Sequence, residues 1–511
     1  SVSGGNNTAI GKNALTDNTS GQQNVAVGSQ ALEENITGSN NTALGHAALE
    51  NGTAGSNNTG LGFASLFNNT ASNNTGVGYN SLKLNTTGQQ NVAVGANALD
   101  ANTTANANTA IGFDAMSANT TGTQNTALGT NALEYVQTGN DNTGLGYVAL
   151  MNAGGAQNTA VGSRALQDMT TGDDNVAVGY HALHTNTTAS DNTAVGSGAL
   201  YLNTTGANNT AVGKGVLDAN TTGGNNTAVG YDALGANTTA SYNVAMGYAA
   251  LNANTTGATN TAVGYESLGG NTTGASNTGV GGYALYTNST GSSNTALGQG
   301  ALQSNTTASD NTAVGKNSLV ANTTGTRNTA VGSNALDANT TASDNNAFGN
   351  NALGANTTGN DNNAFGRLAL GANTTGVSNS AFGHATLDAS STNSYNSAFG
   401  AEALTNTTAD NNSGFGFRAL KETTTGTNNT AVGTDALKEN TTGIDNTAVG
   451  SLALDAASTG SYNTAVGTRA LGACTGSGHC AVGEDALMTM TTGTQNIAMG
   501  QSALRLLPTG N

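Results

Sequence analysis

The stretch NTAIGKNALTDNTSGQQ, residues 7–23, recurs along the whole chain, with new copies beginning at Asn24, Asn41 and Asn58 and the last two at His479 and Asn496. Thirty copies follow one another, almost always 17 residues apart. Numbered from its first residue, a copy reads Asn-Thr-Ala-Val-Gly, two variable residues, Ala-Leu, two variable residues, Asn-Thr-Thr-Gly and two variable residues. So short and fixed a period is typical of a solenoid, in which each copy forms one coil of a stack.

Four positions of the copy scarcely vary. Position 5 is always Gly, position 4 is always apolar, position 3 is always Ala or Gly, and position 9 is Leu in every copy except one, which has Met116. β-Branched residues at positions 2 and 4 favour a strand, and the Gly that follows allows the backbone to turn. We therefore predict an all-β fold, a parallel β-solenoid of about 30 coils of 17 residues. In the first three copies the structural residues are Gly11, Gly28, Gly45, Leu15, Leu32, Leu49, Asn7, Asn24 and Asn41.

Variation in length also indicates coils. Four copies have sixteen residues, those beginning at Asn58, Asn142, Asn396 and Asn463, and each deletion falls after the Leu. The segment from Asn to Leu therefore keeps its frame, and the Asn-Thr-Thr-Gly segment is an adjustable corner. Since no linker or charge run divides the chain, we predict one continuous repeat domain over residues 1–511. With strands ~4.7–4.9 Å apart, thirty coils would form a rod on the order of 140 Å long.

Composition excludes several classes of function. The formal charge is −17 with only twelve Lys and Arg, which makes nucleic acid an unsuitable partner because phosphate binding needs a clustered basic face. No apolar run is long enough to cross a membrane, so we expect no membrane insertion by this segment. Regular apolar positions also argue against disorder.

The strand positions raise the question of a partner. Positions 2 and 4 face one side of the strand and position 3 the other, and neither side is properly polar. A strand that is apolar on both sides is usually buried on both sides. We expect one side to fill the coil and the other, with its small position 3, to approach another copy, most simply in a parallel homotrimer. The alternative is a monomeric solenoid that carries the small residue at its surface.

Residues 6–11, Asn-Asn-Thr-Ala-Ile-Gly, and their recurrences at residues 40–45 and 225–230 resemble the Asn-Ser-Val-Ala-Ile-Gly motif of the heads of trimeric autotransporter adhesins. Similar repeats occur in phage-type tail fibres. The resemblance implies a left-handed β-roll, three chains and an adhesive fibre at the cell surface. The copies here are longer than the family's head repeats of about fourteen residues, which implies a different coil cross-section.

Repeated asparagines predict ladders of side-chain amides along the stack. One would run through Asn7, Asn24 and Asn41. The other would run through the corner residues Asn102, Asn119, Asn203 and Asn220. The same triplets match the acceptor pattern for N-glycosylation, which the structural placement of so many copies disfavours, although a few exposed ones could be used.

Position 4 becomes Phe in five consecutive copies, Phe348, Phe365, Phe382, Phe399 and Phe415. Rings stacked at the coil spacing would form an aromatic column. Because the equivalent positions elsewhere are taken as core Val and Leu, we interpret the column as a thickening of the core. A groove for an apolar ligand is the alternative.

The chain has two cysteines, Cys474 and Cys480, in one altered corner, which predicts a local disulfide in an oxidising setting. Pairing between chains stays open, and a metal site with His479 ranks below the disulfide because no fourth ligand is apparent. The five histidines are scattered along the chain, so we predict no catalytic residues, no cofactor and no metal.

These features predict a non-enzymatic structural protein. Our first hypothesis is an extracellular, adhesin-like fibre shaft at the cell surface that associates with itself and holds a tip for a host or surface ligand. The second is the subunit of an extracellular filament that stacks end to end. A distant third is an ice-binding solenoid, based on corner threonine pairs such as Thr103-Thr104, Thr323-Thr324 and Thr340-Thr341.

Overall fold

The computed structural model describes residues 4–506 and 509–510. Those residues form short strands joined by turns, without a helix. Contacts divide the chain into two units, residues 1–256 and residues 257–511. We describe each unit by itself, and the single domain expected over residues 1–511 stays a prediction.

The strands of unit 1 are β1 to β15, one for each copy of the repeat. Their bounds are β1 Thr8–Ile10, β2 Val25–Val27, β3 Thr42–Leu44, β4 Thr59–Leu61, β5 Thr75–Val77, β6 Val92–Val94, β7 Thr109–Ile111, β8 Thr126–Leu128, β9 Thr143–Leu145, β10 Thr159–Val161, β11 Val176–Val178, β12 Thr193–Val195, β13 Thr210–Val212, β14 Thr227–Val229 and β15 Val244–Met246.

The strands of unit 2 follow the same plan. Their bounds are β16 Thr261–Val263, β17 Thr278–Val280, β18 Thr295–Leu297, β19 Thr312–Val314, β20 Thr329–Val331, β21 Asn346–Phe348, β22 Asn363–Phe365, β23 Ser380–Phe382, β24 Ser397–Phe399, β25 Ser413–Phe415, β26 Thr430–Val432, β27 Thr447–Val449, β28 Thr464–Val466, β29 Cys480–Val482, β30 Thr492–Gly493, β31 Ile497–Met499 and β32 Thr509–Gly510. The short strands β30 and β32 pair with each other.

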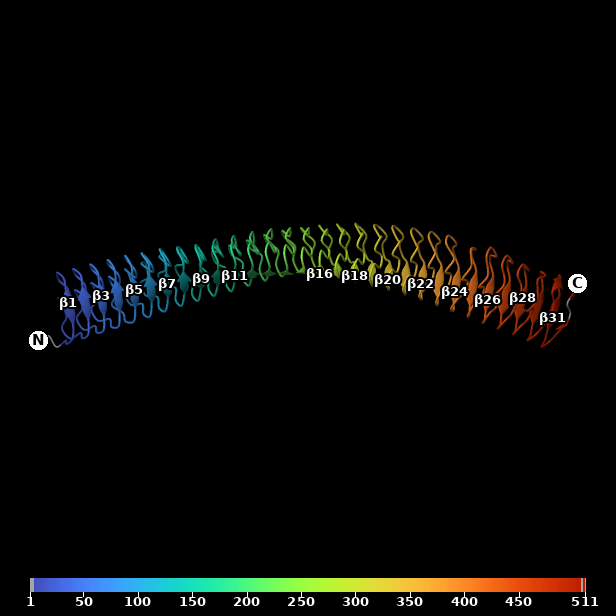
Figure 1. The fold of residues 1–511 in the computed structure, drawn as a ribbon, viewed down its shortest axis with the longest axis horizontal. Helices are drawn as coiled ribbons and strands as arrows, with labels where there is room; N and C mark the ends of the chain where they lie inside the picture. Colours follow the sequence, from blue (N-terminus) through green and yellow to red (C-terminus); the bar gives the residue numbers. More distant parts are fainter. Residues whose placement is uncertain (1–3, 507–508, 511) are drawn as a thin grey trace. The chain divides into compact units, whose positions relative to one another are not determined.

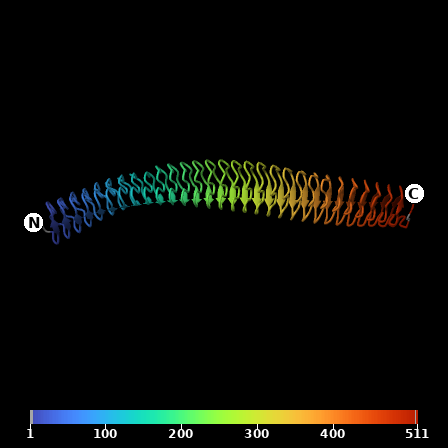
Figure 2. The same cartoon turned by 45° about the horizontal axis from the view of Figure 1, so that its top comes forward.

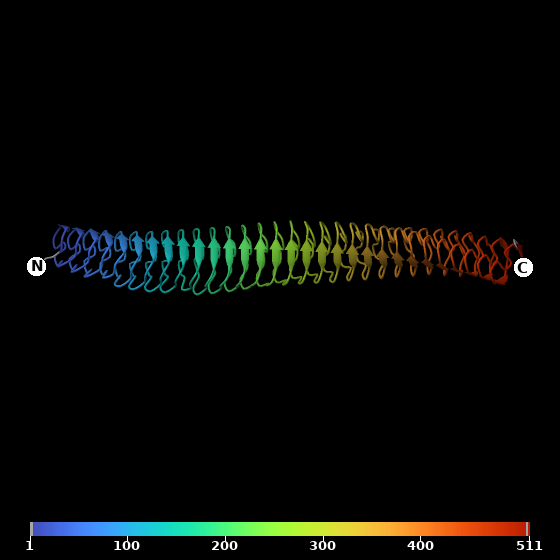
Figure 3. The same ribbon diagram turned by 90° about the horizontal axis from the view of Figure 1, so that it is seen from below.

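Within each unit, neighbouring strands pair in parallel and in register. Thr8 pairs with Val25 and Ile10 with Val27, and Phe348 pairs with Phe365 in the same way. Figure 1 labels strands of both units, and the strand arrows of each unit stand side by side in Figures 2 and 3. The all-β parallel solenoid predicted from the 17-residue period is confirmed, with about 29 turns.

The interior of each coil holds positions 3, 8 and 9. Ala26, Ala31 and Leu32 of the second copy are at most 1% exposed, and their equivalents are buried in the same way in the coils between the first and the last copy. An ideal Cβ at Gly144 would overlap Cδ1 of Leu133, which indicates how little room the interior leaves opposite the Leu. The strand therefore turns its small residue inward.

This orientation corrects the sequence-based expectation that position 3 faces a partner. Positions 2 and 4 point away from the interior, where they are half-buried or exposed. The physical reason is the narrow coil, in which a Leu from the opposite wall fills the space and admits only Ala or Gly on the strand. The stack thus has one buried apolar layer and one apolar outer face.

Position 5 is Gly for two reasons. Gly28 has φ of 140°, a conformation that residues with a Cβ rarely adopt, and a Cβ there would overlap the carbonyl oxygen of Gly45 in the next coil. The same holds for Gly11 and Gly45. Position 9 also has positive φ, which is 52° at Leu32, although its residue is bulky. Coil-to-coil hydrogen bonds hold that backbone, since the Leu32 N–H donates to the Ala48 carbonyl at 3.0 Å.

The first asparagine ladder runs through position 1. Asn24 donates its backbone N–H to Oδ1 of Asn7 at 2.8 Å, and Asn41 donates its own to Oδ1 of Asn24 at 2.9 Å. Nδ2 of Asn24 donates to the carbonyl of Gly38, at position 15 of the same coil. The predicted ladder exists, and its amides bond both to backbone groups and, in many coils, to the amide of the preceding coil, as Nδ2 of Asn175 donates to Oδ1 of Asn158 at 3.1 Å.

The second ladder runs through position 12 and does join amide to amide. Nδ2 of Asn119 donates to Oδ1 of Asn102 at 3.2 Å, and Nδ2 of Asn220 donates to Oδ1 of Asn203 at 2.8 Å. All four side chains are fully buried. A glycan on any of them would not fit the folded coil.

Candidate interaction face

The outer face of the sheet carries two columns of side chains, from positions 2 and 4 of each strand. In unit 1 these are mostly Thr or Val at position 2 and Val, Leu or Ile at position 4. Leu44 is 48% exposed and Val212 36%, which is high for apolar residues on a paired sheet. We call these two columns the outer face.

The outer face is free of charge. The chain has twelve basic and 29 acidic residues, and none of them occupies position 2 or 4 in strands β1–β29 or β31, all of which the structure describes. Charged side chains lie instead at positions 6, 7, 10, 11, 16 and 17, in the turns. This separation was not predicted, although a count of charges by repeat position finds it in the sequence.

The five Phe residues lie on this outer face and not in the core. Phe399 and Phe415 are 38% exposed, and the other three are partly buried. Neighbouring rings stack with centroids 4.5–5.1 Å apart and interplanar angles of 5–9°. The expected aromatic column is present, but its interpretation as a thickened core is wrong, because position 4 points outward.

The strands with Phe differ at position 2 as well. Strands β21 and β22 have Asn346 and Asn363 there, and β23, β24 and β25 have Ser380, Ser397 and Ser413. Every other strand of the stack has Thr, Val, Cys or Ile at this position. The Phe column therefore stands beside a column of smaller or polar side chains.

The two cysteines lie on opposite sides of the coil wall. Cys474 takes the inward position 12 and is fully buried, whereas Cys480 takes the outward position 2 of β29 and is half-buried. Both are free thiols, so the expected disulfide is not formed. Burial raises the pKa of the Cys474 thiol to about 11.

His479 replaces Asn at position 1 and keeps the ladder intact. Its Nε2 lies 3.1 Å from the Gly493 carbonyl, and its Nδ1 accepts the Asn496 backbone N–H at 3.2 Å. A neutral ring with the proton on Nε2 supplies the donor and acceptor that an Asn amide would. Burial lowers the pKa of His479, which favours that neutral form.

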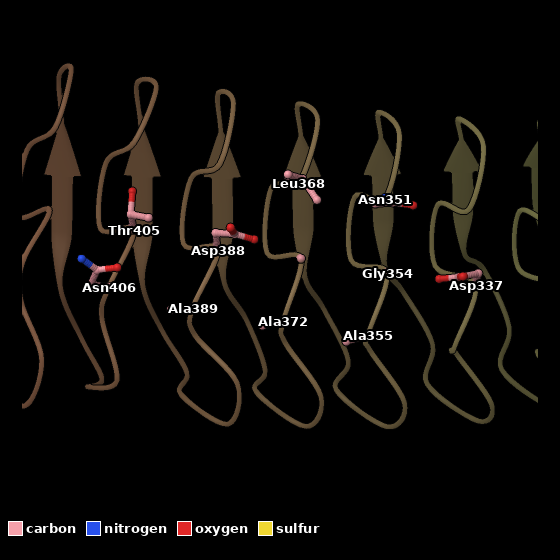
Figure 4. A pocket seen from close by; sticks show the side chains of 11 residues that line it. Asp337, Asn351, Gly354, Ala355, Leu368, Ala372, Asp388, Ala389, Thr405 and Asn406 are labelled. Atoms are coloured by element: carbon pink, nitrogen blue, oxygen red, sulfur yellow. The ribbon is translucent and has the colours of Figure 1, made fainter.

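A shallow groove of about 540 Å³ lies on the turn side of unit 2 (Figure 4). It opens where position 10 is Gly, at Gly354 and Gly371, between coils that carry Asp337 and Asp388 at that position. Burial raises the pKa of both carboxyls. With Leu368 in its lining, the groove mixes apolar and acidic character.

Corner threonines use their first hydroxyl within the stack. Oγ1 of Thr86 donates to the Thr103 carbonyl at 2.9 Å, and Oγ1 of Thr323 donates to the Thr340 carbonyl at 3.0 Å. These hydroxyls therefore join one coil to the next. The ice-binding hypothesis requires corner hydroxyls that are free to order water. Because these hydroxyls bond within the stack, fewer of them are free to do so.

Among residues 4–506 and 509–510, no three His, Cys, Asp or Glu side chains are grouped so that they could hold a metal ion. The same part of the chain forms no helix of the length and apolarity that a membrane span requires.

Comparisons with known proteins do not identify a relative. No protein-family model matches the chain, and no curated protein sequence matches it either. The resemblance to adhesin heads thus stands on the short repeated motif alone.

Proposed function

We propose that this protein is a non-enzymatic structural shaft of an extracellular, adhesin-like fibre, in which copies of the chain associate through their outer faces. A parallel homotrimer of left-handed coils at the cell surface is the form that the resemblance to adhesin heads implies. The observation that carries the proposal is the uncharged outer face in a chain of net charge −17.

The distribution of charged residues favours self-association through the outer face over association through the turns. Two copies that met through their turns would bring carboxylates together and desolvate them, which is costly. The outer face instead presents Thr, Val, Leu, Ile and Phe side chains. Copies could join there without burying a single charge.

Area supports the proposal as well. A three-residue strand is about 10 Å long and strands lie ~4.7–4.9 Å apart, so the fifteen strands of unit 1 offer a strip of roughly 700 Å². A stable interface buries about 800 Å² per partner. Unit 1 alone therefore provides nearly enough apolar surface.

The proposal is tested by placing charge on the outer face. We expect the parent protein to sediment as a multiple of its 50.0 kDa chain, with three chains as the predicted number. The double variant V212D/V229D should sediment as a single chain, because it would bury carboxylates without partners.

A matched control adds the same charge away from the face. Thr205 and Thr222 lie at exposed corner positions of the same region. The variant T205D/T222D should keep the mass of the parent. A parent protein with the mass of one chain at all concentrations would reject the proposal.

A further inference from the structure

We infer that the five Phe strands, β21–β25, fix the register in which copies of the chain align along their outer faces. This inference rests on the proposed self-association and names a segment that the proposal itself does not need. All the residues that carry it lie in unit 2.

Uniform repeats leave alignment undetermined. From β16 to β20 position 2 is always Thr, and position 4 is Val except for one Leu. Sliding one copy past another by a single coil, ~4.7–4.9 Å, would place Thr and Val in nearly the same surroundings. Register is weakly specified wherever a face looks the same after such a shift.

Strands β21–β25 end that uniformity. The stacked rings form a ridge, and Asn346, Asn363 and the three Ser side chains form a lower column beside it. Nδ2 of Asn346 donates to Oδ1 of Asn363 at 2.8 Å, which holds part of the lower column in place. We call this pair of columns the ridge segment.

The ridge is suited to be an anchor. Its inner rings are stacked on both faces, so they are already ordered before a partner arrives, and their exposed edges carry no charge. Aromatic residues, Phe included, are enriched in protein interfaces, where a few buried residues supply most of the binding energy. Copies in register would bring ridge segments together, while a shifted copy would press a ridge against a flat Val and Thr surface.

The joint change of positions 2 and 4 supports this reading. Each strand that gains a Phe also loses its β-branched neighbour, and strands without Phe keep Thr, Val, Cys or Ile at position 2. The bulky residue and the smaller or more polar one appear together five times in succession. A partner copy aligned on this segment would meet the Phe ridge, and its own Phe ridge could pack against the lower column of Asn and Ser.

The experiment measures distances between chains. In a background with C474A and C480T, a spin label is attached to T442C, an exposed corner site outside the ridge segment and away from the outer face. If the inference is right, the parent gives one narrow distribution of distances between labels in neighbouring chains.

A flattened variant then removes the ridge. It replaces the five Phe by Val and their five position-2 neighbours by Thr, so that positions 2 and 4 of β21–β25 match those of β19 and β20. We expect it to keep the mass of the assembled parent and to lose the narrow distribution, which should become broad or split into several distances. The single-strand variant S380T/F382V should widen the distribution less, and it serves if the flattened variant does not fold.

A matched control changes the same number of strands without making a ridge. It replaces position 4 of β16–β20 by Ile, and its distribution should equal that of the parent. A transplanted ridge, with Ser and Phe placed in β16–β20 of the flattened variant, should restore a narrow distribution.

The outcomes separate the two proposals. A narrow distribution in the flattened variant, with the assembled mass retained, would overturn the register inference and leave self-association standing. A broad distribution in the assembled parent would overturn it as well. A parent with the mass of a single chain would overturn both.

Discussion

Two regions of unit 2 solve the same problem of buried polar groups in different ways. In residues 260–378 the inner position 12 is Asn in every coil, and the seven side chains are Asn271, Asn288, Asn305, Asn322, Asn339, Asn356 and Asn373. In residues 379–495 it varies, through Ser390, Thr407, Thr423, Asn440, Ala457, Cys474 and Met490. Position 1 meanwhile stays Asn through both regions, except for His479.

Position 12 varies and position 1 does not because their amides have different hydrogen-bond partners. Position 1 satisfies a backbone N–H of the next coil, which no apolar side chain can do. A position-12 amide bonds chiefly to the position-12 amide of the neighbouring coil and to a backbone carbonyl. Position 1 donates to the same carbonyl, since Nδ2 of Asn24 and Nδ2 of Asn35 both donate to the carbonyl of Gly38. A run of position-12 amides can thus end. Among the described residues of unit 2, Asn373 closes the run and Asn440 stands alone, and each has an Oδ1 without a partner.

The largest loss of unfolding free energy is expected at position 5, which is Gly in both regions. Replacing Gly332 or Gly450 by Ala forces a side chain into a conformation with φ of 139° or 135° and onto the carbonyl oxygen of the next coil. We expect each change to cost about 2–6 kcal/mol of unfolding free energy, from strain and overpacking together. Denaturant unfolding measures the cost, and equal values for the two variants would agree with position 5 being the same in both regions.

The ladder itself predicts the next largest effect. Asn322 donates to Oδ1 of Asn305 and to the Gly325 carbonyl, and it accepts from Asn339. The variant N322L would leave Oδ1 of Asn305 without its donor and would take from Nδ2 of Asn339 one of its two acceptors, at about 2–4 kcal/mol. Chemical denaturation gives this difference.

A control for that variant comes from the varied region. Oγ1 of the buried Thr407 has no hydrogen-bond partner within the part of the chain that the structure describes. The isosteric variant T407V should therefore be neutral or slightly stabilising. If it cost as much as N322L, the distinction between the two regions would be lost.

A titratable residue in the position-1 ladder makes the varied region sensitive to pH. Burial lowers the pKa of His479 from its ordinary 6.5, so the unfolded chain takes up the proton at higher pH than the folded one. The contribution of His479 to the free energy of unfolding is thus fully present above about pH 6.5. It declines as the pH falls from there to the pKa of the folded state.

The variant H479N isolates this effect, since the other histidines remain. The difference in unfolding free energy between the parent and H479N should change as the pH is lowered from neutral through 6.5, with the parent losing more. Unfolding curves at a series of pH values measure it. A difference that stays constant with pH would contradict the neutral ladder member described above.

The smallest expected effect restores an amide to the varied region. In A457N the new Nδ2 would lie where it can donate to Oδ1 of Asn440, which lacks a partner among the described residues. We expect a gain of up to about 1 kcal/mol in unfolding free energy. Thermal or denaturant unfolding would detect it, and a loss above 1 kcal/mol would indicate that the coil cannot hold an amide there.

The sequence predicted the period, the strand, the turn at Gly28 and its equivalents, and both amide ladders. It did not predict which side of the strand faces inward, because alternation defines two sides without ranking them. The range of side-chain sizes at each strand position does indicate which side faces inward. Position 3 is limited to Ala or Gly, whereas position 4 ranges from Val27 to Phe348, which only a surface accommodates.

The predicted disulfide is absent from the structure, where both thiols are free. Cys474 and Cys480 are close in sequence, but the frame of the repeat assigns one to an inward position and the other to an outward one. The uncharged outer face was also missed, although the repeat positions of the charged residues already contain it. Its partner is a proposal that sequence and fold together support.

Hydroxyl-radical footprinting of the outer face tests the central claim most directly. In the parent the Phe side chains of β21–β25 should be protected from oxidation, and in V212D/V229D they should become reactive, because the face is uncovered. Tyr79 and Tyr147, which are 54% and 52% exposed in the turns, should react equally in both proteins. Equal oxidation of the Phe side chains in the two proteins would contradict the claim that another copy covers this face.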